Sequence, residues 1–138
     1  MKRPMFYGII VLLVGFITVA WASIPRMVAT WTPNVEPDVV GYNLYMTTNL
    51  SNFCLDGLTT GQIKLRMNEW KDQGLLIQQI GGREVDTFNI DVPLEGTIYH
   101  FAIAALDGSN QESIPALVSS KSGDYPPSTP LDFSVVAE

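Results

Sequence analysis

Residues 97–106 read TIYHFAIAAL and form the most apolar strand pattern in the chain. Apolar side chains recur at every second position, so Tyr99, Phe101 and Ile103 fall on one face of an extended strand and His100 on the other. The sequence DGSN follows at residues 107–110 and has the composition of a turn. The stretch therefore predicts a strand with one face against a core.

Further strands are predicted along the rest of the chain, at residues 27–31, 40–47, 75–80, 87–92, 116–120 and 131–136. Turn chemistry separates them, with Pro, Asp, Asn and Gly residues at the junctions. Several short strands joined by such turns predict an all-β protein, an antiparallel β-sandwich.

The middle of the chain, residues 49–80, carries two competing patterns. Gln62 to Met67 alternates polar and apolar residues, which suits a strand. Thr59 and Gln62 instead fit a capping box, and Gly74 is a suitable helix end. Ile63, Met67 and Trp70 then share one helical face, so a short helix over residues 60–72 is favoured.

Residues 1–22 form a separate segment with the pattern of an export signal. Lys2 and Arg3 precede an uncharged run at residues 6–22, and Ala-Trp-Ala at 20–22 offers a cleavage site before Ser23. The alternative is a retained anchor, in which case an N-terminal hydrophobic helix at residues 6–22 precedes the sandwich and is its only membrane contact. Both alternatives place residues 23–138 outside the cytoplasm, as a secreted, periplasmic or cell-surface protein.

The charge balance excludes binding of a nucleic-acid backbone as the main role. The chain carries 8 Lys and Arg against 14 Asp and Glu, whereas such binding needs a basic patch. Without Lys2 and Arg3 the mature part has 6 basic residues against 14 acidic ones, a net charge of −8. That is the charge of an acidic exported domain.

Four pieces of the chain together resemble a fibronectin type III domain. They are ATWTPN at 29–34, EPDVVGYNLY at 36–45, LEGTIY at 94–99 and DGSNQES at 107–113. The resemblance implies an immunoglobulin-like sandwich over residues 23–123, in which the Tyr99 side chain bonds back to the backbone of its corner. The chain departs from the family in Glu95, where a Pro is usual, in an inserted segment at 49–74, and in having no room for a first strand.

The C-terminal tail, residues 124–138, is rich in Pro and ends in one more strand pattern at 131–136. This pattern resembles the family's missing first strand. Two explanations fit: the segment folds back onto its own domain, or it pairs with a neighbouring molecule by strand addition.

No residue set predicts catalysis, a cofactor or a metal site. The chain has one His and one Cys, which leaves no metal cluster and no nucleophilic triad. Cys54 lies between Phe53 and Leu55 and is expected to be buried. The acidic pairs, Glu36 with Asp38 and Asp107 with Glu112, are expected to form turns.

The sequence thus predicts a non-catalytic protein-interaction or structural module whose partner is another protein or an envelope component. The alternative is a membrane-anchored subunit of a surface or virion assembly, docked through its tail; a carbohydrate-associated accessory domain and an enzyme are favoured less. Aromatic and apolar residues outside the expected core are the candidate partner contacts. They are Tyr45, Trp70, His100, Leu131 and Phe133. For Trp70 the favoured alternative is that it packs the inserted segment onto the sandwich.

Overall fold

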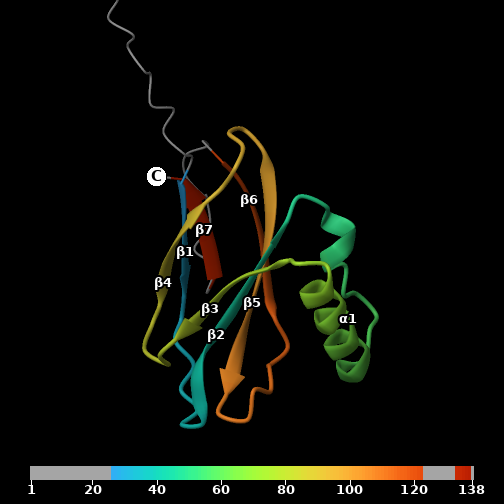
Figure 1. Ribbon diagram of the computed structural model, residues 1–138, viewed down its shortest axis with the longest axis vertical. Coiled ribbons are helices and arrows are strands. Elements are labelled where there is room, and N and C mark those ends of the chain that lie inside the picture. Colours follow the sequence, from blue (N-terminus) through green and yellow to red (C-terminus); the bar gives the residue numbers. More distant parts are fainter. Residues whose placement is uncertain (1–25, 123–132, 138) are drawn as a thin grey trace, which may run out of the picture.

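The computed structural model describes residues 26–122 and 133–137, and they form a β-sandwich with one helix on its side (Figure 1). One sheet has three strands in the order β4-β1-β7, and the other has four in the order β3-β2-β5-β6. The strands are β1 (Arg26–Trp31), β2 (Val39–Thr47), β3 (Leu76–Gly81), β4 (Thr87–Asp91), β5 (Ile98–Asp107), β6 (Ala116–Lys121) and β7 (Phe133–Ala137). The helices are the short 3₁₀ helix η1 (Leu50–Phe53) and α1 (Thr60–Asp72). All strand pairs are antiparallel, as the sequence predicts.

The inner faces of the two sheets enclose a cluster that we call the sandwich core. Its buried members are Met27, Ala29, Trp31, Val39, Tyr42, Leu44, Ile80, Ile90, Val92, Tyr99, Phe101, Ile103 and Val135. The two-residue alternation of the strands selects these residues, because successive side chains point to opposite faces of a sheet. The face predicted for Tyr99, Phe101 and Ile103 on β5 is therefore confirmed.

Strand β7 completes the three-stranded sheet by pairing with β1 of the same chain. The register runs from Met27 opposite Ala137 to Trp31 opposite Phe133. The C-terminal strand therefore folds back onto its own domain, which is one of the two explanations that the sequence leaves open. Predictions for Leu131 and for residues 1–22 fall outside the described residues.

The inserted segment forms the predicted helix α1. The Thr59 hydroxyl accepts a hydrogen bond from Gln62 N, and the Gln62 side chain accepts one from Thr59 N, which makes the capping box. Gly74 follows the helix with a φ of +73°, a left-handed conformation that glycine adopts without steric cost. The helix interpretation of residues 60–72 is thus confirmed, and the strand alternative for 62–67 is wrong.

Helix α1 packs on the outer face of the four-stranded sheet, where it closes a second cluster that we call the helix-side core. Its buried members are Tyr45, Phe53, Ile63, Met67, Trp70, Ala102 and Ala104. The small side chains of Ala102 and Ala104 on β5 leave room for the helix. β5 is consequently buried on both faces, which its alternating pattern alone does not predict.

This second core decides three expectations about exposure. Tyr45 is not a surface contact residue, since its side chain is 0% exposed, and Trp70, at 1% exposed, packs residues 49–74 onto the sandwich, which is the alternative that the sequence favours. Their rings pack edge to face at 5.4 Å, and Trp70 Nε1 donates to the Asn52 carbonyl at 2.7 Å. Conversely, Cys54 is exposed rather than buried, because it lies just beyond η1 and not within it.

The corner between β4 and β5 is held by Tyr99. Its hydroxyl accepts a hydrogen bond from Leu94 N at 3.1 Å and lies 3.4 Å from the Leu94 carbonyl. The predicted bond between this side chain and the corner backbone is therefore present. Among the described residues, no helix is long and apolar enough to cross a membrane.

Candidate binding surface

Three connections meet at the end of the sandwich opposite the Tyr99 corner, at the bottom of Figure 1. They are the loops β1–β2 (residues 32–38), β3–β4 (residues 82–86) and β5–β6 (residues 108–115). Direct hydrogen bonds join them: Gly108 N donates to the Asp38 carbonyl at 3.3 Å, and the Arg83 guanidinium to the Glu36 carbonyl at 3.5 Å. We call these three loops together the loop end.

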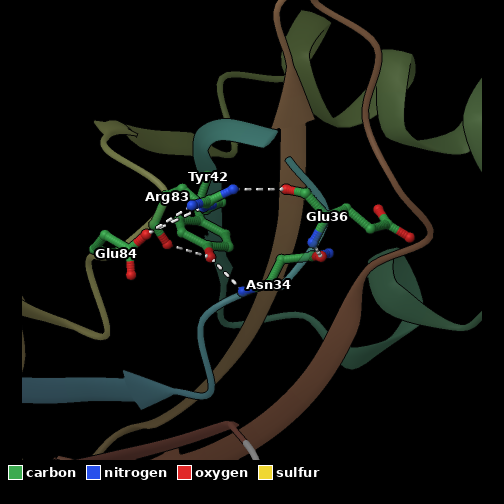
Figure 2. Close-up of polar contacts among 5 residues, drawn as sticks. All are labelled: Asn34, Glu36, Tyr42, Arg83 and Glu84. Carbon is green, nitrogen blue, oxygen red and sulfur yellow. Dashed lines mark hydrogen bonds and ion pairs between the residues drawn. The ribbon is translucent and has the colours of Figure 1, made fainter. Parts of the chain in front are cut away.

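The backbone of the loop end is held by the hydroxyl group of Tyr42 (Figure 2). This hydroxyl accepts a hydrogen bond from Asn34 N at 2.7 Å and donates one to the Arg83 carbonyl at 2.8 Å. The Asn34 side chain in turn accepts from Glu36 N at 2.9 Å and fixes the β1–β2 turn. A core side chain thus fixes two loops at once.

Glycine at position 41 is required for the close approach of β2 and β3 beneath these loops. A Cβ atom at Gly41 would lie 2.2 Å from the Ile80 carbonyl oxygen. The ladder between β2 and β5 shifts register between Val39 and Gly41, which bends β2 as it leaves the loop. Gly41 and the neighbouring register shift therefore determine how β2 leaves the β1–β2 loop.

Apolar side chains are exposed on this fixed frame. Val35 is 90% exposed at the tip of the β1–β2 loop, and Ile114 is 51% exposed on the β5–β6 loop. A shallow hollow of about 190 Å³ lies at this end, lined by Trp31, Tyr42 and Ile114 among others. Exposed apolar groups on a rigid frame favour association, since little side-chain and loop entropy is lost on binding.

Trp31 lines the hollow with an indole N–H that finds no acceptor in the described part of the chain. Its ring packs edge to face on Tyr42, with ring centroids 5.3 Å apart. A buried donor without an acceptor is costly, at about 1–3 kcal/mol. Trp31 is therefore placed for packing, at some cost in hydrogen bonding.

The rim of the loop end is acidic. Glu36, Asp38, Glu84 and Asp86 are all exposed there. The Arg83 guanidinium lies 3.0 Å from the Glu84 carboxylate in a surface ion pair, which adds little stability. A partner that matches this rim carries basic groups around an apolar centre.

The contact residues predicted from sequence are not brought together here. Tyr45 and Trp70 lie in the helix-side core, and the backbone of Phe133 lies in β7. His100 is half-buried on the outer face of β5, where its Nδ1 lies 2.5 Å from Ser119 Oγ and burial lowers the pKa of the ring. It borders a separate hollow of about 350 Å³ with Leu50 and Leu117, away from the loop end.

The loop end is not predicted from the sequence, because the turn residues there are expected to have only structural roles. The available signal was Val35, an isolated apolar residue between Pro33 and Pro37 where turn residues are usually polar. Nothing in the sequence alone shows that this loop and the β5–β6 loop share one end of the molecule.

In the described ranges, no three His, Cys, Asp or Glu side chains converge as a metal-binding group. No protein-family model matches the chain, and no curated protein matches it significantly. The function is therefore inferred from the sequence and from the geometry of this surface.

Proposed function

We propose that the chain is a non-catalytic, extracytoplasmic interaction module of fibronectin type III type, with the loop end as its contact surface. The observation that carries the proposal is the exposure of Val35, 90%, on a loop whose backbone is bonded to the buried Tyr42. A side chain presented in this way gains free energy by burial against a partner, about 25 cal/mol per Å² of apolar area.

The type of module is supported by the order of the strands. β1, β2, β5 and β6 contain or adjoin the four pieces that carry the resemblance, and β7 takes the position beside β1 that the family's first strand occupies. The hydrogen bond of Tyr99 to Leu94 is further support, since it joins the residues of the corner motif. Because such folds host many functions, the site and not the fold carries the functional argument.

The partner we propose is a protein or envelope component with basic groups around an apolar patch. The acidic rim, which includes Glu36 and Glu84, would steer such a partner toward the loop end, and salt would slow the encounter. The apolar centre at Val35 and Ile114 would supply most of the affinity.

The test is a quantitative pull-down from the envelope fraction of the source cells, with residues 23–138 as bait. Val35→Asp and Ile114→Asp place a charge at the centre of the proposed contact and should each lower capture at least about tenfold. Leu65→Asp is the matched control, because Leu65 is 64% exposed on α1, away from the loop end. Capture that is unchanged in Val35→Asp would refute the proposal, and loss of capture in Leu65→Asp would place the contact on α1 instead.

The second function, an anchored subunit that docks through its tail, makes a separate prediction about the N-terminus. Intact mass of the native protein that begins at Ser23 indicates an exported module, whereas a mass that includes Met1 indicates an anchor. Because β7 pairs with β1 along its whole length, docking through this strand would require it to leave its own sheet. The loop-end proposal needs no such rearrangement.

A further inference from the structure

Glu112 on the β5–β6 loop carries a carboxylate that is almost fully buried, with its side chain 7% exposed. Oε1 accepts hydrogen bonds from Asn43 Nδ2, at 2.5 Å, and from the Tyr45 hydroxyl, while Oε2 is 2.5 Å from Lys71 Nζ. The sequence predicts a turn-forming role for this residue, and that prediction is wrong. Asp107 does form the turn, since its carboxylate accepts from the backbone N–H groups of Ser109 and Gln111.

The four side chains join three separate parts of the fold. Asn43 and Tyr45 lie on β2, Lys71 is in the last turn of α1, and Glu112 is in the loop. Burial by itself would raise the pKa of Glu112, but the hydrogen bonds from Lys71, Tyr45 and Asn43 outweigh burial and hold that pKa below its usual value. The carboxylate is therefore charged at neutral pH and depends on all three partners.

The anchored residue adjoins the loop-end surface. Glu112 forms an isolated bridge with Leu106, and the next residue, Ser113, donates its N–H to the Ala105 carbonyl at 2.9 Å. Ile114 follows directly and is the exposed apolar residue of this loop. The hydrogen bonds to the Glu112 carboxylate therefore also fix the position of the segment that presents Ile114.

We infer that α1 is a positioning element for the contact surface: through Lys71 and Glu112 the inserted helix holds the β5–β6 loop in the conformation that presents Ile114. The helix itself lies on the side of the sandwich (Figure 1), and it lines a hollow together with residues 110–112 of the loop. The effect on the loop is independent of any partner, and the effect on binding rests on the proposed function.

The first measurement is hydrogen exchange by mass spectrometry on the free protein. Lys71→Met removes the cation and keeps the aliphatic stem, and it should speed exchange of peptides spanning residues 108–115 at least about tenfold, with β1 and β4 unchanged. Arg66→Met is the matched control, because it also removes a cation from α1, and Arg66 lines a hollow with Leu58 and Leu65 to which no loop-end residue contributes. Glu112→Gln, which keeps the side-chain volume, should act in the same direction as Lys71→Met. Unchanged exchange of residues 108–115 in Lys71→Met would overturn the inference.

The second measurement is capture of the partner in the assay described above. Lys71→Met should weaken capture about 3- to 10-fold. The effect should be smaller than that of Val35→Asp, because Lys71→Met loosens the β5–β6 loop without changing any exposed apolar contact residue. If Val35→Asp leaves capture unchanged, the proposed function fails while the exchange result still decides whether α1 holds the loop. If Val35→Asp abolishes capture and Lys71→Met loosens the loop without weakening capture, the positioning role is overturned and the proposed function stands.

Discussion

The sandwich core and the helix-side core are both buried and both use β2 and β5, yet they differ in chemistry. The sandwich core is apolar apart from the hydroxyl and indole groups at its edges, and it contains no acidic residue. The helix-side core instead has a charged network at its border, in which Glu112 bonds to Lys71, Tyr45 and Asn43. The four-stranded sheet therefore packs its inner face through apolar contacts, and its outer face through apolar contacts together with a charged network.

The difference shows what each core specifies. Apolar packing is non-directional, so alternation and volume are enough to bring two sheets together. A buried carboxylate is costly unless every lone pair is matched, so its partners must take one arrangement. The charged network therefore fixes where α1 sits and how the β5–β6 loop leaves the sheet.

The largest expected effect comes from Trp70, which anchors the helix-side core. Trp70→Ala should lower the free energy of unfolding by about 3–5 kcal/mol, as for other buried Trp residues. Leu65→Ala on the exposed side of the same helix should change it by no more than about 0.5 kcal/mol. Urea denaturation measures both values, and a loss below about 1 kcal/mol for Trp70→Ala would mean that the second core contributes little.

A smaller effect is expected from a pair of tyrosine hydroxyls, one at each core. Tyr45→Phe removes one hydrogen bond to a charged group and should cost about 1.5–3 kcal/mol, whereas Tyr42→Phe removes two bonds to backbone groups, each worth about 0.5–1.5 kcal/mol. Both variants keep the ring, so packing is matched in the comparison. If the loss of stability per hydrogen bond is larger for Tyr42→Phe than for Tyr45→Phe, the contrast between the two cores is wrong.

The smallest effect is expected from pH, because protonated Glu112 can still take part in hydrogen bonds. The folded pKa of Glu112 lies below its usual value near 4.5, so its contribution is present above that pH and is lost as pH falls through the lower folded value. Stability measured from pH 6 down to pH 3 should fall less steeply in Glu112→Gln than in the unmodified chain. Identical slopes would show that the network does not depend on the charge of Glu112.

Much of the fold could be predicted from the sequence because it is local. The faces of β2 and β5 follow from alternation, and the bounds of α1 follow from Thr59, Gln62 and Gly74. The candidate site could not be predicted in the same way. Tyr45 and Trp70 are residue types that are common at contact surfaces, but their rings pack against each other. Val35 belongs to the candidate surface only because loops that are distant in sequence meet at the same end of the sandwich.

The alternating strands, the capped helix and the turns follow from neighbours along the chain, and the acidic charge follows from composition. Three features depend on the folded arrangement: β7 pairs with β1, α1 covers the outer face of β5, and Glu112 reaches Lys71 from 41 residues away. They differ because burial and charge pairing depend on what faces a side chain across space. A one-dimensional pattern states which face a residue is on, and not what lies opposite that face.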